Sequence, residues 1–260
     1  MKNNNDWNPD LYLKYRNERT QASIDLVNRI SIDFIPEKII DIGCGPGNSS
    51  EILRRRWQSA RIVGLDSSAS MIEKAKSDYP DSEWIIANAL TYETKEKFDV
   101  VFSNATIQWI PNHKELLKKF YGMLSDRGII AVQLPLFRDM PLGKAIENVS
   151  KLKKWKSKTD GVSNLFTIYD YFFYYDVLSK LFNSIDLWVT NYIHILESQF
   201  SILEFIRSSG LKPYLERLDS ESEKLEFEEE VLGLIKKDYP LQENGKVLVP
   251  FKRLFFIAYK

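Results

Sequence analysis

The sequence predicts an α/β fold with a doubly wound, mostly parallel sheet and helical insertions. Five short apolar runs rich in β-branched residues recur along the first half of the chain, spaced to leave room for one helix each. They are continuously apolar rather than alternating, which is typical of parallel strands covered on both faces. The first run breaks into a glycine-rich turn, as at a strand-to-helix junction. The expected strands are Lys38–Gly43, Arg61–Asp66, Glu83–Asn88, Phe98–Ser103 and Gly128–Leu134.

Helix signals fill the gaps between these runs and continue beyond them. After the second run, Ser67-Ser68 offers capping residues, and the next stretch carries Met71, Ile72 and Ala75 on one helical face. Farther along we expect a helix over Tyr171–Leu181, a strand over Ser184–Ile195, a turn at Asn244-Gly245 and a strand over Lys246–Tyr259.

The pattern predicts a single domain over residues 1–260 with two helical insertions. Its core covers about 20–135, 171–195 and 246–260, and its insertions cover about 136–165 and 198–240. The first insertion contains the basic stretch Lys151–Lys158. We expect that stretch to be a solvated helix face, with attraction of an anionic substrate or lipid as the alternative.

Composition narrows the class of protein. Lys+Arg 36 and Asp+Glu 36 give a formal net charge of zero, which disfavours a nucleic-acid partner. One cysteine cannot form an internal disulfide, and the polar start MKNNNDWNPD lacks a signal-peptide core, so the sequence suits a reducing cytoplasm. No apolar run is long enough to span a bilayer, and we expect a monomer without a membrane partner.

The segment IIDIGCGPGNSS (Ile39–Ser50) is the most informative motif. Its glycines let a ligand approach the backbone where a helix begins. The dinucleotide pattern needs a third glycine at the position of Asn48, which makes an NAD-dependent oxidoreductase the weaker interpretation. Asp66, at the end of the second run, can accept hydrogen bonds from ribose hydroxyls in either kind of cofactor. Together these features predict a nucleoside site, and an ordinary tight turn is the structural alternative.

With glycines at the first, third and fifth positions after an aspartate, this segment resembles the first motif of class I S-adenosylmethionine-dependent methyltransferases. The resemblance implies a Rossmann-like fold, S-adenosyl-L-methionine as the cofactor, and insertions that form a lid over the substrate together with the N-terminal segment. At Asn88 the family typically has an acidic residue near the adenine amino group, and an amide carbonyl can still accept that hydrogen bond. The cofactor residues implied are Asp41, Gly43, Gly45, Gly47, Asp66, Ser67, Met71, Asn88, Ala89 and Asn104.

The fourth strand ends in Ser103–Trp109, which we expect at the carboxyl edge of the sheet, where open α/β sheets bind ligands. An amide at Gln108 can orient a polar methyl acceptor. Trp109 is interpreted either as a substrate contact or as core packing.

Five segments together resemble the trans-aconitate 2-methyltransferase family: DWNPDLYLKY, GCGPGNSS, GLDSSASMI, SNATIQWI and YPLQENGKVLVPFKRLFFIA. The resemblance implies methyl transfer from S-adenosylmethionine to a carboxylate of trans-aconitate or a related small polycarboxylic acid. A methyltransferase of the same fold acting on another acceptor, such as a malonyl thioester, stays open.

A polycarboxylate substrate needs cationic and hydroxyl donors, among which arginine suits bidentate pairing. A carboxylate with a pKa near 4 is already ionised at pH 7, so no catalytic acid or base is assigned. His113, His194 and Cys44 are not expected to form a metal site. The acceptor-binding candidates are Arg19, Lys212, Arg253, Tyr12, Tyr15 and Tyr214, each with an alternative role as a surface charge or half-buried ring.

Overall fold

The computed structural model describes residues 7–8 and 14–260. The chain divides into two compact units, which we call the core unit and the helical unit. The core unit consists of Met1–Leu134, Thr167–Val189 and Leu254–Lys260, and the helical unit of Pro135–Phe166 and Thr190–Arg253. Whether they form one domain with two insertions stays a prediction, although both predicted insertions fall within the helical unit.

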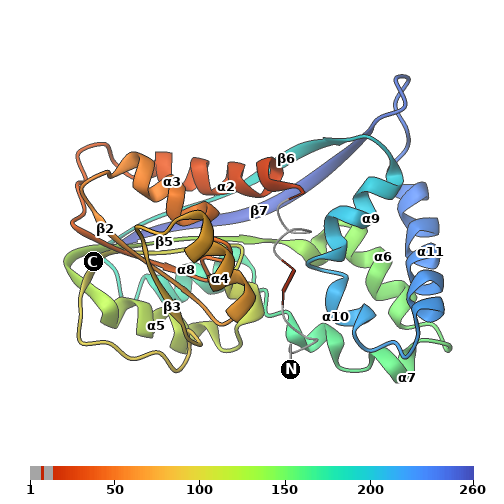
Figure 1. Cartoon of the computed structure of the whole chain (residues 1–260), viewed down its shortest axis with the longest axis horizontal. Coiled ribbons are helices and arrows are strands. Elements are labelled where there is room, and N and C mark those ends of the chain that lie inside the picture. The colour runs from red at the N-terminus through yellow and green to blue at the C-terminus, as the bar shows by residue number, and fades with distance from the viewer. Residues whose placement is uncertain (1–6, 9–13) are drawn as a thin grey trace. The chain divides into compact units, whose positions relative to one another are not determined.

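Among the described residues, seven strands form one sheet in the order β3-β2-β1-β4-β5-β7-β6 (Figure 1). The pairs β1–β2, β2–β3, β1–β4 and β4–β5 are parallel, which confirms the predicted doubly wound sheet. The strands are β1 (Lys38–Ile42), β2 (Arg61–Asp66), β3 (Glu83–Ile86), β4 (Phe98–Asn104), β5 (Leu124–Pro135), β6 (Ser184–Leu196) and β7 (Val247–Tyr259).

Helices surround the sheet of the core unit and make up most of the helical unit (Figure 1). The core unit contains α2 (Arg16–Arg29), α3 (Asn48–Arg56), α4 (Ala69–Asp78), η1 (Ile107–Trp109), α5 (His113–Met123) and α8 (Tyr171–Leu178). The helical unit contains η2 (Phe137–Asp139), α6 (Pro141–Ser150), α7 (Lys156–Thr159), η3 (Val162–Leu165), α9 (Gln199–Arg207), α10 (Lys212–Leu215) and α11 (Glu221–Asp238).

Helices α3 and α4 lie on the same face of the sheet. Asp41, which bonds to α3, and Trp84, which packs against α4, are both in register with Gly64 and so project from one face. The β4-α5-β5 connection steps across the sheet in the opposite direction, so right-handed crossovers place α5 on the other face. The strand order reverses between β2 and β4 on either side of β1, and this switch point is where such sheets bind ligands.

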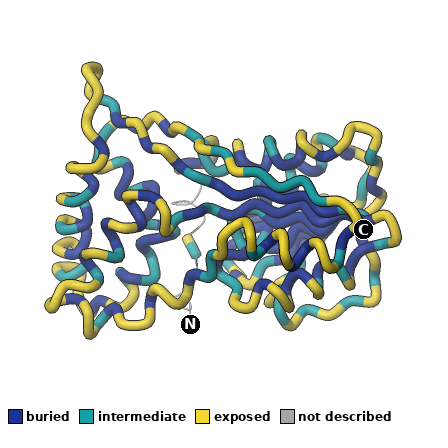
Figure 2. Tube along the Cα trace, turned by 180° about the vertical axis from the view of Figure 1, so that it is seen from behind, coloured by how far each residue is buried: buried dark blue, intermediate teal, exposed yellow. Residues whose placement is uncertain are grey.

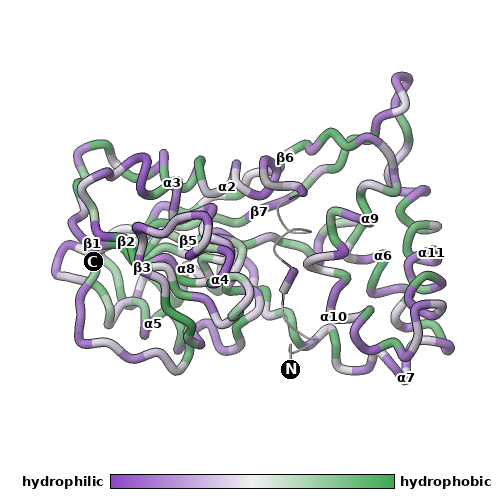
Figure 3. The backbone as a smooth tube through the Cα atoms, viewed as in Figure 1, coloured by the Kyte–Doolittle hydropathy of each residue, from purple (hydrophilic) through white to green (hydrophobic). Residues whose placement is uncertain are grey.

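Burial explains why the strands could be predicted from the sequence. In the core unit the sheet is a band of buried residues, and its central strands are hydrophobic over most of their length (Figures 2 and 3). The predicted cap at Ser68 is confirmed, since its hydroxyl accepts from the N–H of Met71, and Met71, Ile72 and Ala75 are buried as expected. The turn at Asn244-Gly245 is also confirmed, with Gly245 at a φ of +78°.

Three boundaries differ from the prediction by more than one residue. Strand β5 begins at Leu124 rather than Gly128, because Leu124 pairs with Phe98 across a bulge despite the polar residues that follow it. Strand β3 ends at Ile86 rather than Asn88, because Asn88 forms a turn. The helix predicted to reach Leu181 ends at Leu178.

The basic stretch Lys151–Lys158 is mostly exposed, as predicted, but the predicted helix is wrong for residues 151–155, which form turns between α6 and α7, and the stretch is not a uniform positive patch. Its Trp155 is fully buried and packs edge-to-face on Phe227 at 5.5 Å. Its lysines face acidic residues of the helical unit: Lys151 pairs with Glu147, Lys154 with Glu226, and Lys158 with Asp219 and Glu223. These ion pairs offset the charge of three of the five lysines, and those to Glu223 and Glu226 connect the stretch to α11, which has both hydrophilic and hydrophobic residues along its length (Figure 3).

Candidate active site

Glycines with positive φ angles shape the turn between β1 and α3. These angles are +74° at Gly43, +54° at Gly45 and +94° at Gly47. A Cβ at Gly43 would lie 2.0 Å from the side chain of Thr106, so this position tolerates no side chain. A Cβ at Gly45 would meet no described atom within 4 Å, and only its positive φ resists substitution. The backbone of Gly45 is therefore the part of the turn that a ligand can approach.

The Asp66 carboxylate connects the end of β2 to the glycine turn. It accepts hydrogen bonds at 2.9 Å from the N–H of Gly45 and at 2.9 Å from the N–H of Ser68. A carboxylate at the end of the second strand is the group that accepts hydrogen bonds from ribose hydroxyls in folds of this kind. Ser67 is exposed beside it, while Met71 is buried in α4.

Asp41 is fully buried at 0% exposure on β1. Its Oδ2 accepts hydrogen bonds from the hydroxyls of Ser49 at 2.6 Å and Ser50 at 2.7 Å. Burial raises the pKa of Asp41 to about 6. The hydrogen bonds from the two serine hydroxyls lower this pKa, and the charge of Asp66 makes a smaller contribution that raises it. Its Oδ1 accepts no hydrogen bond from any described residue. Because such an atom costs about 1–3 kcal/mol when buried, it is suited to a donor group on a ligand.

Asn88 and Ala89 form the turn after β3. The Asn88 side-chain oxygen accepts the N–H of Leu90 at 2.9 Å, so part of its acceptor capacity holds the turn. Asn88 is itself exposed. Its second lone pair can still accept from an adenine amino group, as the resemblance implied.

The loop after β4 folds back onto the glycine turn. The Thr106 hydroxyl donates to the backbone oxygen of Gly43 at 3.0 Å, and Gln108 Nε2 donates to the backbone oxygen of Ala105 at 2.6 Å. Gln108 is buried at 5% exposure. Within the described chain, neither Asn104 Oδ1 nor Gln108 Oε1 has a hydrogen-bond partner although both are buried. The loop thus brings unsatisfied amide oxygens to the carboxyl edge of β4.

Trp7 is a residue at this site that the motifs did not predict. Its ring lies edge-to-face on Trp109, with centroids 5.2 Å apart, and its backbone oxygen accepts the Ser70 hydroxyl at 2.7 Å. The sequence signal was only its place in the resembling N-terminal segment. Trp109 itself is half-buried, which leaves both interpretations of it open.

Gln133 is a second residue that was not predicted. It lies on β5 with 0% exposure, and neither Nε2 nor Oε1 bonds to a described residue. In the sequence, the signal for Gln133 was that it is a single polar residue within the apolar run GIIAVQLP.

His113, the titratable residue nearest this loop in sequence, is engaged elsewhere. His113 is fully buried, with Nδ1 2.7 Å from the Tyr174 hydroxyl and Nε2 2.8 Å from the backbone oxygen of Ile107. Burial lowers the pKa of His113 and raises that of the Cys44 thiol, so both are neutral at pH 7. Over residues 7–8 and 14–260, no group of three or more His, Cys, Asp or Glu could hold a metal ion.

The acceptor-binding candidates are divided between the two units. Tyr12 lies outside the described residues. In the core unit, Tyr15 is buried at the start of α2 and Arg19 is half-buried one turn later. In the helical unit, Lys212 forms an ion pair with Glu216.

The remaining two candidates are buried in the helical unit. Arg253 is 3% exposed, with its guanidinium 4.6 Å from the Phe251 ring centroid and 5.8 Å from that of Tyr192. Tyr214 stacks near Phe227, and burial raises its pKa to about 12, so it remains a hydroxyl donor at pH 7.

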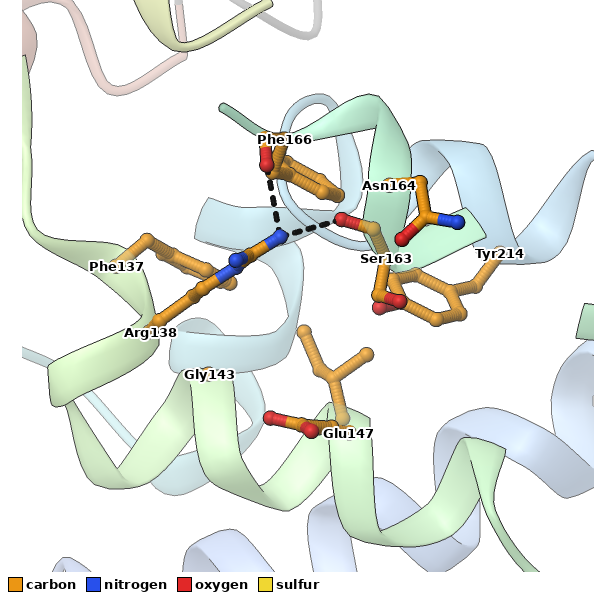
Figure 4. Close-up of a pocket in the computed structure, with 9 residues that line it drawn as sticks. Phe137, Arg138, Gly143, Glu147, Ser163, Asn164, Phe166 and Tyr214 are labelled. Carbon is orange, nitrogen blue, oxygen red and sulfur yellow. Dashed lines mark hydrogen bonds between the residues drawn. The ribbon is translucent and has the colours of Figure 1, made fainter. Parts of the chain in front are cut away.

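Tyr214 lines a cavity of about 160 Å³ in the helical unit, together with Phe137, Arg138, Gly143, Ile146, Glu147, Ser163, Asn164 and Phe166 (Figure 4). The Arg138 guanidinium crosses this cavity and donates through Nη2 to the backbone oxygens of Ser163 at 2.6 Å and Phe166 at 2.7 Å. Because these bonds tie η2 to η3, Arg138 has a structural role in this unit.

The residues of the core unit fit a cationic nucleoside cofactor. Asp66 offers carboxylate acceptors beside the open backbone of Gly45. The buried acceptors Asp41 Oδ1 and Asn104 Oδ1 have no donor among the described residues. The ammonium and hydroxyl groups of S-adenosylmethionine are donors that complement this set.

Comparison with known proteins agrees with this geometry. A family model described as a methyltransferase domain matches residues 40–132. The trans-aconitate 2-methyltransferase of Enterobacter sp. (strain 638) is 36% identical over 254 residues, covering 97% of this chain and 98% of that protein. The enzyme of the same name from Escherichia coli (strain 55989 / EAEC) is 37% identical over 253 residues, with the same coverage.

A solved structure shares the fold. It is that of Haemonchus contortus phosphoethanolamine N-methyltransferase 2 in complex with S-adenosyl-L-methionine, with a TM-score of 0.60 and 18% identity. The match covers 97% of this chain and 56% of that one, and at this identity it bears on the fold alone.

The fold, the matching methyltransferase domain and the named relatives define a class I S-adenosylmethionine-dependent methyltransferase. The chain belongs to the trans-aconitate 2-methyltransferase family, since relatives above 30% identity align over nearly its whole length. This membership excludes the NAD-dependent oxidoreductase that the glycine motif had left open. No helix in the described part of the chain is long and apolar enough to cross a membrane.

Proposed function

We propose that this enzyme transfers a methyl group from S-adenosylmethionine to a carboxylate of trans-aconitate, or of a closely related small polycarboxylic acid, to form a monomethyl ester. The observation that carries this proposal is the match to named trans-aconitate 2-methyltransferases over 98% of their length. The match therefore includes the helical unit as well as the cofactor motifs that all class I methyltransferases share.

The cofactor residues inferred from the sequence are proposed to act at the edge formed by β3, β2, β1 and β4. When bound, S-adenosylmethionine supplies a methyl carbon that is already electrophilic. Asp66 would hold the ribose hydroxyls, and Asp41 and Asn104 would accept from donor groups of the methionyl part. Gly43, Gly45 and Gly47 shape the turn, and Ser67, Met71, Asn88 and Ala89 border the nucleoside.

A carboxylate acceptor makes a protein base unnecessary. Its pKa near 4 leaves it ionised at pH 7, so no proton must leave before the oxygen attacks. The loop Asn104–Trp109 contains no His, Asp, Glu or Lys, and both ring nitrogens of His113 already have partners. Positioning can then supply most of the catalysis, up to roughly 7–11 kcal/mol from proximity and orientation. Gln108 and Trp109 are proposed to perform this positioning.

Acceptor binding by Tyr12, Tyr15, Arg19, Lys212, Tyr214 and Arg253 stays a prediction. Replacing Arg19, Lys212 or Arg253 by a neutral residue should raise the KM for the acceptor far more than the KM for the cofactor. Lys212 forms an ion pair with Glu216, so an acceptor carboxylate would have to compete with Glu216 for it. If all three variants keep the wild-type acceptor KM, the countercharge comes from other residues.

A direct test of the proposed activity compares acceptors. The enzyme is incubated with S-adenosylmethionine carrying a deuterated methyl group and with trans-aconitate, other polycarboxylic acids or a malonyl thioester, and the products are identified by mass spectrometry. Label in a polycarboxylate ester supports the proposal. Label in the malonyl thioester alone would instead assign the alternative acceptor.

The cofactor site has its own test by calorimetry. Asp66→Ala should weaken S-adenosylmethionine binding by removing the ribose acceptor, and Gly45→Val should abolish it by covering the backbone. Unchanged affinity in either variant would contradict the site assignment. We further propose that the protein is a cytoplasmic monomer without a nucleic-acid partner. Light scattering can check the monomeric state, and a gel-shift assay can check nucleic-acid binding.

A further inference from the structure

The side chain of Gln133 is buried in the core unit without any hydrogen-bond partner among the described residues. It is 0% exposed, and both its amide nitrogen and its amide oxygen lack a partner there. Buried polar groups in folded proteins are nearly always satisfied, and exceptions call for a functional explanation. A position in an apolar strand that holds an amide instead of a leucine or methionine is therefore a candidate ligand contact.

Gln133 belongs to the carboxyl edge where the cofactor site lies. It pairs in register with Asn104 of β4, and its backbone oxygen accepts the N–H of Ala105 at 2.9 Å. Residues paired across neighbouring strands project from the same face, about 4.8 Å apart. Gln133 and Asn104 therefore form adjacent amides, with unsatisfied oxygens on both.

Register also places these amides on the face of the sheet that carries Asp41. Asp41 pairs with Phe102, and Asn104 lies two residues beyond Phe102, so alternation puts both on one face. From β2 to β5 the edge presents Asp66, the glycine turn after β1, Asn104 and then Gln133. Asp66 and Gln133 are three strand spacings apart, roughly 14 Å. If Asp66 holds the ribose, Gln133 lies beyond the methionyl part of the cofactor, on the side where an acceptor must approach.

We propose that Gln133 Nε2 donates a hydrogen bond to the carboxylate that receives the methyl group. This inference rests on the proposed carboxylate acceptor. One carboxylate oxygen forms the new bond to the methyl carbon while the bond from that carbon to sulfur breaks, and the sulfur keeps the electron pair as a neutral thioether. The other carboxylate oxygen is free to accept from the amide.

A neutral amide suits this position better than an arginine. The accepting carboxylate loses its negative charge as the ester forms, so a full ion pair would stabilise the ground state more than the transition state. An amide donor orients the carboxylate without that penalty. Cationic residues are then better placed at the carboxylates that do not react.

The test uses two substitutions at Gln133 and one control. Gln133→Met keeps the unbranched shape and removes both polar atoms. Gln133→Glu keeps the shape but replaces the donor with a second carboxylate. The control Leu134→Met changes the next residue of β5, which is buried on the opposite face. For each variant the melting temperature, the affinity for S-adenosylmethionine and the kinetics with trans-aconitate are measured.

Gln133→Met should lower kcat/KM for the acceptor ten- to a hundredfold, the effect of losing a hydrogen bond to a charged group. Its cofactor affinity should stay within twofold of wild type, and its melting temperature should equal or exceed the wild-type value because an unsatisfied amide is removed. Gln133→Glu should lose at least as much activity at pH 7.5 by charge repulsion. Leu134→Met should match wild type in both ligand measurements.

Three results would overturn the inference. Acceptor kinetics of Gln133→Met within twofold of wild type would remove the proposed contact. Weaker cofactor binding in Gln133→Met with tighter binding in Gln133→Glu would assign Gln133 to the cofactor ammonium instead. A large fall in melting temperature with all kinetic constants declining together would indicate a structural role. If the wild-type enzyme methylates no polycarboxylic acid at all, the proposed function is wrong. The inferred contact between Gln133 and the acceptor carboxylate is then wrong as well.

Discussion

Replacing Asp41 by asparagine should stabilise the cofactor-free protein at neutral pH while weakening cofactor binding. Asp41 is fully buried and its pKa is raised to about 6, chiefly by burial. Asparagine keeps an oxygen that can accept from Ser49 and Ser50 but carries no charge. The substitution therefore removes the unfavourable ionisation and retains the hydroxyl contacts.

The size of the effect follows from the pKa. A rise from the ordinary value of 3.8 to about 6 corresponds to about 3 kcal/mol of folding free energy. The pKa of Asp41 is higher in the folded than in the unfolded protein, so the protonated carboxyl favours folding. This stabilisation is fully present below the ordinary pKa of 3.8 and is lost as the pH rises through about 6. Between pH 5 and pH 7.5 the wild type should lose about 1.4 kcal/mol through this group, and the Asp41→Asn variant should lose none of it.

Urea unfolding followed by tryptophan fluorescence at these two pH values measures the difference. The stability of Asp41→Asn relative to wild type should rise by about 1.4 kcal/mol from pH 5 to pH 7.5, with all other groups titrating alike in both proteins. Ser50→Ala is the matched control. The Ser50 hydroxyl lowers the pKa of Asp41, so its removal should make the free energy of unfolding depend more steeply on pH than in wild type. A difference between Asp41→Asn and wild type that is independent of pH, or larger at pH 5, would refute the account.

Three further substitutions test the packing around the site and in the helical unit. Gly43→Ala should lower the free energy of unfolding, measured by urea titration, by about 1–3 kcal/mol or more, because the φ of Gly43 is +74° and a Cβ there would lie 2.0 Å from a neighbouring side chain. A smaller loss would show that this contact relaxes. Trp7→Ala should reduce kcat/KM about two- to tenfold through loss of an edge-to-face pair, with little change in melting temperature, and unchanged kinetics would make that pair incidental. Arg207→Ala should destabilise the protein by about 3–5 kcal/mol because it leaves buried Glu228 without its bidentate partner, and a loss below about 1 kcal/mol would show that water replaces the arginine.

The fold could be predicted because its signals are local. Continuous apolar runs marked β1, β2 and β4 to within a residue, and capping chemistry marked the start of α4 at Ser68. The start of β5 was wrong because a bulged pairing with Phe98 depends on a strand distant in sequence.

The site was only partly predictable, because its parts depend on different ranges of sequence. The glycine turn and Asp66 form a short, ordered motif. Trp7 and Gln133 become significant only when the sheet brings them beside the loop after β4, and a single glutamine in an apolar strand carries no such information by itself. The acceptor-binding candidates come from both units, and their chemical type alone does not show which of them binds the acceptor.

Single-turnover methyl transfer to trans-aconitate as a function of pH tests the central claim most directly. Enzyme saturated with labelled S-adenosylmethionine is mixed with trans-aconitate, and formation of the monomethyl ester is followed by quenched-flow mass spectrometry. Since the acceptor is ionised and no base is required, the rate should be nearly constant from about pH 6.5 to pH 8.5. A rate that rises about tenfold per pH unit in this range would show that a proton must leave first, and would contradict methyl transfer to a carboxylate.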